Sequence, residues 1–534
     1  MAVNWPGLLA IVVFYMAVLC IGIWASRKSK REESKCTGNR SEVAMVGGRN
    51  LNIWVSIFTM TATWVGGNYI LGNAEVVYDP TKGLVWAIGP IGYSMNMILG
   101  GLFFVKPVRS KNYVTLMDPL QEKYGNTVAA VLFIPALLGD ILWIAGVLGA
   151  LGGTISVVID IPPSVAVVVS AAVAILYTLM GGLYSVAYTD VIQLGFMLVG
   201  LWLCVPFILT SSTPANFTAA TVSKLYQESW LGKLELEDVG RWLDDVLLMS
   251  ISGICYQAFY QRVLSCGSDT QAKITCYTGA VLCPILAIPS LIIGAVAAST
   301  NWNQTTYGSP SPYEQGKAGM ILPIALQHLC PLYVSLVGMG ALAAAVMSSV
   351  DSALLSASSQ MGRNIFKNII YKQASEKTIL VVVKVSVVLC GVLGAGLALT
   401  TRSIYQLWIF SADVVYSMLT PQVTCSFFLP QWVNNYGACS GFVLAILLRV
   451  LVGEPLIGLP DVMPLPWDKI QENGHRNRLF PFRTAIMLIT TGTILLVSCL
   501  AAWLSEKRLL KISNSKTDTN MHYISPVQKE VEET

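Results

Sequence analysis

Charged residues are scarce in this sequence. Asp, Glu, Lys and Arg make up 12% of its 534 residues, whereas soluble proteins average about 25%. Hydrophobic residues make up 54% even when glycine is left out. Because so few charged side chains cannot cover a soluble protein of this length, most of the chain must lie in lipid. The composition excludes a soluble enzyme, a disordered protein and a secreted disulfide scaffold.

Residues that build metal and nucleotide sites are also rare or badly spaced. The chain has only three His, and its 12 Cys form no C-x-x-C pair, so the sequence lacks a metal-ligand framework. Neither Gly232-Lys233 nor Gly316-Lys317 is followed by Ser or Thr, which excludes a phosphate-binding loop of the Walker type. The net charge of +4 gives no indication of nucleic-acid binding. If this protein is a transporter, we expect it to use an ion gradient.

What the sequence does contain is long apolar runs. A helix needs about 20 apolar residues to cross a bilayer. The chain therefore predicts an all-α integral membrane protein with 13 transmembrane helices in contact with the lipid bilayer. The thirteen runs lie at 8–26, 51–77, 84–105, 126–158, 163–181, 187–210, 241–263, 271–299, 320–358, 378–400, 405–429, 436–452 and 482–505.

The distribution of Lys and Arg predicts the orientation of these helices. Loop 27–50 carries seven Lys and Arg, and more follow the third, ninth and last runs; such an excess marks cytoplasmic loops. The N-terminus is then outside, 1–26 is an extra N-terminal span, and 27–50 is a basic cytoplasmic loop. We also expect an extracellular loop at 211–240 and a short cytoplasmic tail at 506–534. The glycosylation sequon that starts at Asn303 lies on the outside.

Two of the runs are interrupted by polar and small residues. Three Thr, two Gly and an Asn lie between Thr59 and Asn68, and a second polar stretch, Ser250 to Gln257, follows five runs later. Transporters bind their cargo where such broken helices expose carbonyl groups; the alternative is a packing face of small residues. Five-run spacing fits an inverted repeat of five plus five helices. Its halves would be 51–210 and 241–429, with 430–505 as two additional C-terminal spans.

Three aromatic residues lie near the middle of their runs rather than in the interfacial belts. They are Trp64, Tyr93 and Trp143, and ordinary core packing is the alternative for each of them. Taken together beside a broken helix, they suggest an aromatic cage. Such a cage suits a quaternary ammonium, whose charge is delocalised and which carries no proton to donate.

Acidic residues within the runs indicate ion coupling, because an intramembrane charge is costly unless it has a function. Asp351 follows Ser348 and Ser349 and precedes Ser352, and these hydroxyl and carboxylate oxygens are ligands suited to Na⁺; a polar clasp between helices is the alternative. Asp190 would either join an ion site or cap the helix that begins there. Asp140, Glu75, Asp413, Lys384 and Arg449 have no assigned role.

At these residues the chain resembles a known family. Over residues 8–505 it is similar to the sodium/solute symporter family, and within it to members that take up choline. The resemblance implies a LeuT-like fold with one extra N-terminal span, and choline uptake that depends on Na⁺ and Cl⁻. The matching runs are Phe58 through Tyr69, Gly92 through Ser94, Gly100 through Ser110, Gly181 through Gln193, Trp302 through Thr305 and Val346 through Ser359.

The resemblance also implies roles for particular residues. The carboxylate of Asp190 matches the one that related symporters use for a second Na⁺, while no motif indicates a chloride site. It further implies a multi-pass protein of the plasma membrane, and of the presynaptic membrane and its vesicles. The choline cage would comprise Trp64, Tyr93, Trp143, Tyr256 and Trp408, and the Na⁺ site the carbonyls of Ala62 and Val65 with Ala345, Ser348 and Ser349 opposite.

Three positions depart from the choline-transporting members of the family. Tyr256 stands where they have Trp, Asn68 where a third Gly is usual, and Asp140 where Glu is usual. The tail also lacks the longer family tail with its dileucine signal, and no trafficking partner is indicated. Two alternatives to choline uptake therefore stand. One is the same fold with another organic cation or an osmolyte as substrate; the other is a channel or a membrane-embedded enzyme.

Overall fold

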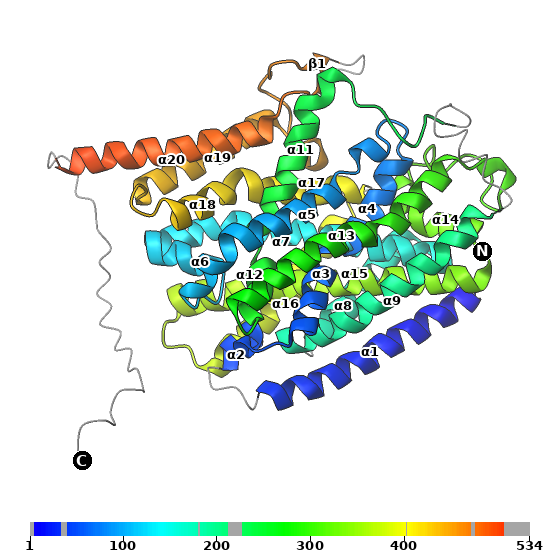
Figure 1. Cartoon of the computed structure of the whole chain (residues 1–534), viewed down its shortest axis with the longest axis horizontal. Coiled ribbons are helices and arrows are strands. Elements are labelled where there is room, and N and C mark those ends of the chain that lie inside the picture. The colour runs from blue at the N-terminus through cyan, green and yellow to red at the C-terminus, as the bar shows by residue number, and fades with distance from the viewer. Residues whose placement is uncertain are drawn as a thin grey trace.

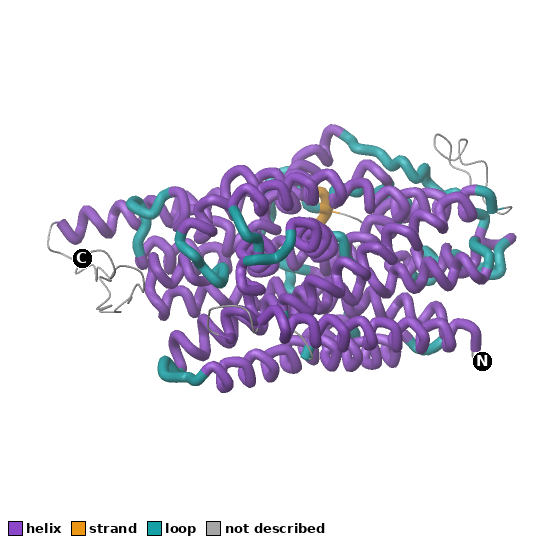
Figure 2. Tube along the Cα trace, turned by 60° about the horizontal axis from the view of Figure 1, so that its bottom comes forward, coloured by secondary structure: helices purple, strands orange, loops and turns teal. Residues whose placement is uncertain are grey.

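The protein is an elongated bundle of helices, most of which run roughly along its long axis (Figures 1 and 2). The computed structural model describes residues 5–33, 40–179, 182–211, 227–401, 403–470 and 476–506. The expected tail therefore lies outside the described residues from 507 onward, and the expected loops 27–50 and 211–240 lie partly outside them. The described strands are β1 (Lys469–Ile470) and β2 (Arg476–Asn477), which pair antiparallel.

Eight of the thirteen expected spans form helices that are long and apolar enough to cross a membrane, among the described residues. The remaining five runs are not among these candidates, and two of them contain the shorter apolar helices Ile53–Trp64 and Pro163–Thr178. The structure thus shows a mostly helical protein with eight candidate spans and does not confirm a count of thirteen. The eight are Leu84–Ser110, Met117–Ile159, Leu183–Leu209, Asp269–Ala298, Leu332–Ile370, Glu376–Ala398, Asn435–Val452 and Phe482–Ser505.

The first expected break is present. α3 (Ile53–Trp64) begins at Asn52, whose side chain accepts a hydrogen bond from the Trp54 amide, and α4 (Gly67–Tyr78) starts after an extended residue, Gly66. A Cβ on Gly66 would overlap the Ser349 hydroxyl. Only glycine allows α15 (Leu332–Gln360) to approach the broken backbone this closely.

The second expected break is also present. α11 (Val239–Ile251) passes into a 3₁₀ turn, η5 (Ser252–Cys255), and α12 (Gln257–Ser265) follows. Tyr256 between them is extended, with φ −93° and ψ 140°. The chain therefore bends at Tyr256, and the two breaks interrupt their helices among buried residues.

Two sequence expectations about helix boundaries are wrong. Run 320–358 was expected to be one helix, but it forms α14 (Ile321–Leu329) and α15. Cys330 between them is extended (φ −107°, ψ 154°), the conformation that a proline such as Pro331 favours in the residue before it. Asp190 does not cap a helix: α9 (Leu183–Leu209) begins seven residues earlier, and the Asp190 side chain is fully buried inside it.

The remaining helices complete the bundle. α1 lies along its lower edge and packs on α9, whereas α19 and α20 pair at the opposite edge (Figure 1). The long α7 and α13 cross its interior. Their bounds are α1 Trp5–Glu33, α2 Arg40–Val46, α5 Gly89–Leu99, α6 Val105–Ser110, α7 Met117–Ile159, α8 Pro163–Thr178, α13 Asp269–Ala298, α16 Glu376–Ala398, α17 Ile404–Val414, α18 Thr420–Phe428, α19 Asn435–Val452 and α20 Phe482–Glu506.

Short 3₁₀ and π segments join or distort these helices. A π-helix widens the turn by one residue and turns side chains out of register. The π segments are η3 (Gly100–Phe104), η8 (Met361–Ile370) and η9 (Val415–Leu419), and the other 3₁₀ segments are η1 (Gly47–Arg49), η2 (Leu84–Trp86), η4 (Leu236–Asp238), η6 (Trp302–Gln304), η7 (Ala318–Met320) and η10 (Pro455–Ile457).

Candidate functional site

Five aromatic residues expected to form a cage line one cavity beside the two helix breaks. It has a volume of about 30 Å³, room for a water-sized guest or two. Residues from α3, α5, α7, α11, α17 and the second break surround it. The lining residues are Thr63, Trp64, Tyr93, Trp143, Met249, Ser252, Gly253, Tyr256, Trp408, Ser411 and Ala412.

The rings of this cage pack edge to face. Trp408 meets Tyr93 with centroids 5.4 Å apart, and Trp143 meets Tyr256 at 5.6 Å. Behind them Tyr69, which the sequence reading missed, stacks on Tyr93 at 5.1 Å. Such edge-to-face contacts stabilise the ring positions, so the cage walls support one another.

Two indole N–H groups of the cage are already satisfied within the protein. Trp64 Nε1 donates to Asn96 Oδ1 at 3.2 Å, and Trp408 Nε1 donates to Tyr93 Oη at 2.6 Å. Since these donors are engaged, the two Trp side chains offer a guest their π faces rather than their N–H groups. A π face attracts a cation, and the lining is therefore suited to an organic cation.

Tyr256 contributes a hydroxyl to this otherwise aromatic wall. Its Oη lies 2.6 Å from Ser411 Oγ, and Ser411 Oγ donates to the Gly139 carbonyl at 2.9 Å. The Ser411 proton is thereby used, so Tyr256 is the donor in the pair. Ser411 connects the second break to α17 and α7. A Ser in run 405–429 gives no signal of this role in the sequence.

The residues expected to bind Na⁺ lie together at the first break. Ser348 Oγ is 3.4 Å from the Ala62 carbonyl, and Gly66 lies against Ser349 Oγ and the Ala345 carbonyl. Val65 ends α3 with φ −86° and ψ 69°. Ser349 Oγ is buried without a hydrogen-bond partner among the described residues. An unpartnered buried oxygen among carbonyl and hydroxyl groups fits a hard cation such as Na⁺.

Asp190 lies against the same residues. Its carboxylate accepts from Ser348 Oγ at 2.6 Å and from Thr59 Oγ1 at 2.5 Å. Arg262 from α12 forms a buried ion pair with it at 3.3 Å and donates to Ser352 Oγ at 2.6 Å. The sequence reading missed Arg262, although an Arg inside an apolar run was a visible signal.

Asp351 and Asn303 lie elsewhere. The Asp351 carboxylate is buried against α8, where one oxygen accepts from Thr178 at 2.6 Å and the other has no hydrogen-bond partner among the described residues. Its contacts are therefore separate from those of Asp190. Asn303 lies in η6 and is exposed, as an acceptor for a glycan has to be.

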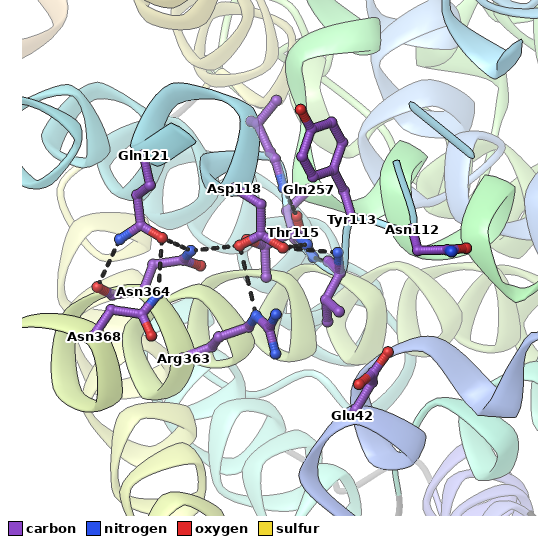
Figure 3. Close-up of polar contacts among 12 residues, drawn as sticks. Glu42, Asn112, Tyr113, Thr115, Asp118, Gln121, Gln257, Arg363, Asn364 and Asn368 are labelled. Atoms are coloured by element: carbon purple, nitrogen blue, oxygen red, sulfur yellow. Dashed lines mark hydrogen bonds and ion pairs between the residues drawn. The ribbon is translucent and has the colours of Figure 1, made fainter. Parts of the chain in front are cut away.

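A polar cluster joins α7, η8 and the loop before α7 (Figure 3). Asp118 accepts hydrogen bonds from the Val114 amide at 2.8 Å and from Asn364 Nδ2 at 2.9 Å, and Arg363 lies 3.5 Å from it. Gln121 Oε1 accepts from Asn364 at 2.8 Å. On the sequence-predicted topology this cluster faces the cytoplasm.

Comparison with solved structures identifies the class of fold. A Na⁺-coupled sialic acid symporter, solved in a substrate-bound outward-open state, aligns with a TM-score of 0.69 at 18% identity, covering 93% of this chain and 98% of that one. MHP1, a nucleobase-cation-symport-1 family transporter, aligns at 0.52 and 11% identity, covering 88% and 96%. The fold is that of multi-pass secondary transporters.

Comparison with protein families and curated proteins gives the particular family. The sodium:solute symporter family matches residues 45–445. The human high affinity choline transporter 1 is 48% identical over 510 residues, covering 96% of this chain and 87% of the relative. The Drosophila melanogaster high-affinity choline transporter 1 is 42% identical, covering 93% and 78%. The chain belongs to the sodium:solute symporter family, whose members are transporters and not enzymes, and Na⁺ is its coupling ion.

Proposed function

We propose that this protein imports choline across the plasma membrane, driven by Na⁺, by alternating access. The observation that carries the proposal is the cavity lined by five aromatic residues, two of which present π faces because their N–H groups are engaged within the protein. Choline is a quaternary ammonium, and π faces attract such cations without needing a hydrogen bond. Relatives of this chain that bear the name choline transporter support the same substrate.

The Na⁺ site of this proposal comprises Ala62, Val65, Ala345, Ser348 and Ser349. Because Ala62 and Val65 end the first half of the broken helix, binding Na⁺ there couples the ion to the position of Trp64, which lies between them. Asp190 serves the same site through Ser348, whereas Asp351 and Ser352 act in coupling through α15. Chloride is proposed as a required ion, on the family resemblance alone.

The proposed arrangement in the membrane follows the thirteen-span reading. The N-terminus and Asn303 are outside, Asn303 carries a glycan, and the two five-helix repeats occupy 51–210 and 241–429. The two helix breaks support this scheme, since each repeat contains one of them near its start. We place the protein in the plasma membrane, including that of nerve terminals and their vesicles.

Uptake of radiolabelled choline by cells that express the chain tests the proposal. We expect saturable uptake that is lost when Na⁺ is replaced by an inert organic cation, and that falls when Cl⁻ is replaced by gluconate. Uptake that is unchanged without Na⁺ would refute sodium coupling. Unchanged uptake without Cl⁻ would refute only the chloride requirement.

A second substrate class has one observation in its favour. The hydroxyl pair of Tyr256 and Ser411 places a polar group in the cage wall, and such a group would serve a substrate with its own hydrogen-bonding atoms. Competition against labelled choline by a panel of organic cations and neutral osmolytes distinguishes the two. A compound that competes better than choline would identify the preferred substrate.

A further inference from the structure

One buried carboxylate in the core has no role in the site described above. Asp140 lies on α7 and is 1% exposed. Its neighbour Gly139 gives its carbonyl to Ser411 of the cage wall, so Asp140 lies beside the substrate cavity. It occupies the middle of run 126–158, which places it near mid-depth in the bilayer on the sequence-predicted topology.

Asp140 lacks the charge compensation that Asp190 and Asp413 have. Asp190 pairs with Arg262 at 3.3 Å, and Asp413 pairs with Arg449 at 2.8 Å. Among the described residues no Lys, Arg or His reaches Asp140 within ion-pair distance. Leaving an ionised carboxylate unpaired in the membrane interior is costly. A cation that binds there would remove this cost.

The groups that face Asp140 are oxygen ligands from one side of α15. Ser356 Oγ lies 3.1 Å and 3.3 Å from the two carboxylate oxygens. Gln360, one turn further along, has its amide nitrogen 3.5 Å from the carboxylate, and its amide oxygen is buried with no hydrogen-bond partner among the described residues. A carboxamide can present either atom by rotating. With a cation bound at Asp140, the Gln360 amide oxygen would turn toward that cation.

We propose that Asp140, Ser356 and Gln360 form an additional Na⁺ site, separate from the one at the first helix break. Carboxylate, hydroxyl and amide oxygens are hard ligands and suit Na⁺ better than they suit a soft metal. Ser356 lies two helical turns beyond Ser348 on α15, about 12 Å along the axis. The site therefore lies between the substrate-linked Na⁺ site and the cytoplasmic end of α15, where a released ion would pass.

This inference rests on the proposed function for its place in the transport cycle, but its test does not need choline. Binding of ²²Na⁺ to purified full-length protein in nanodiscs counts the ions held per transporter. We expect Ser356→Ala and Asp140→Asn each to bind one Na⁺ fewer than wild type. Asp140→Glu keeps a carboxylate and should retain the full count.

A matched control separates the site from general damage to α15. Ser358 Oγ donates only to the Leu355 carbonyl of its own helix and is equally buried, so Ser358→Ala should bind as many Na⁺ as wild type. Ser349→Ala should lose a different ion, and the double variant Ser349→Ala with Ser356→Ala should lose two. A loss in Ser358→Ala equal to that in Ser356→Ala would overturn the assignment.

The remaining outcomes separate this inference from the proposed function. An unchanged Na⁺ count in both Asp140→Asn and Ser356→Ala would overturn the site. Unchanged counts together with lost pH dependence of uptake in Asp140→Asn would show that Asp140 holds a proton instead. If wild type binds Na⁺ but takes up no choline, the proposed function fails while the ion counts still decide the site.

Discussion

At the scale of a single residue, Tyr256 determines how strongly the cage attracts a quaternary ammonium. Trp provides a better face for a quaternary ammonium than Tyr, by roughly 0.5–1 kcal/mol in a desolvated site. Tyr256→Trp should therefore tighten the apparent affinity for choline by about two- to fivefold, with Na⁺ dependence unchanged, because the Na⁺ ligands are other residues. Concentration-dependent uptake measures this.

The hydroxyl of Tyr256 leads to the opposite prediction for a substrate other than choline. If the Tyr256–Ser411 pair serves a substrate other than choline, Tyr256→Trp would weaken uptake of that substrate, and Tyr256→Phe would weaken it as well. Ser411→Ala removes the same hydrogen bond without changing a ring. For choline we expect Tyr256→Phe and Ser411→Ala each to reduce uptake less than the deletion of a cage ring does.

Trp64 is the cage ring most closely tied to the ion site, since it lies between Ala62 and Val65. Trp64→Ala should abolish choline uptake while the protein still reaches the cell surface. Trp64→Phe keeps a weaker ring and should leave partial uptake, although it also frees Asn96 from its indole partner. Surface biotinylation beside uptake measures both quantities. Full uptake by Trp64→Ala would exclude the cage.

How much of this site the sequence predicts depends on the kind of signal each residue leaves. Trp64, Tyr93 and Trp143 are unusual at mid-run, so their pattern alone suggested a shared cavity, and the structure brings them together. Tyr256 and Trp408 required a family resemblance. Ser411 left no signal, because its role depends on where α17 meets α7, which is a property of tertiary packing. Arg262 carried a signal that was overlooked.

At the scale of elements, the first helix break depends on Gly66. A Cβ at this position would overlap Ser349 Oγ, so Gly66→Ala should push α15 away from the break. We expect loss of Na⁺-dependent uptake. Gly396→Ala on α16 is a matched control, because a Cβ there meets nothing within 4 Å. Equal uptake by both variants would show that the close approach is unimportant.

The cluster around Asp118 holds together elements that must separate if the ion and substrate leave toward the cytoplasm. A hydrogen bond to a charged group contributes about 1.5–3 kcal/mol. Asp118→Asn or Asn364→Ala removes one such hydrogen bond and should favour the inward-open state. If the bond contributes about 1.5 kcal/mol, the apparent affinity for choline on the outside should fall by up to about tenfold. Uptake kinetics at matched surface levels measure this.

A nearby surface pair provides the control for that cluster. Lys111 and Glu122 form an ion pair at 2.6 Å, but both side chains are more than half exposed. Such pairs contribute about 0–1 kcal/mol, so Lys111→Gln should leave the affinity for choline unchanged. An equal loss in Lys111→Gln and Asp118→Asn would argue against a specific role for the cluster.

At the scale of the whole molecule, the sequence predicted the class of fold better than the number of spans. Composition and run length are sums over many residues and tolerate local errors, whereas a count requires every boundary to be right. Breaks shorten the helices of runs 51–77 and 241–263, and Pro331 divides run 320–358. The two breaks leave helices that are shorter than a span needs, and they build the binding region, whereas the helix after Pro331 is still long enough to span.

Net charge movement is the property that belongs to the whole transport cycle. Choline is a permanent cation, and each Na⁺ that enters with it adds a further positive charge unless Cl⁻ accompanies them. Every uncompensated charge that moves inward gains about 2.3 kcal/mol per 100 mV of inside-negative potential. Uptake should therefore rise when the membrane is hyperpolarised, and choline should evoke an inward current that disappears without Na⁺.

If Cl⁻ travels with each choline and one Na⁺, a single net charge remains, and replacing Cl⁻ should steepen the voltage dependence of whatever uptake persists. If Cl⁻ is only a bound activator, its removal should lower the current without changing the charge carried per choline. Simultaneous measurement of current and labelled choline at fixed voltage separates these cases. Uptake that does not respond to voltage in the presence of Na⁺ would contradict electrogenic symport.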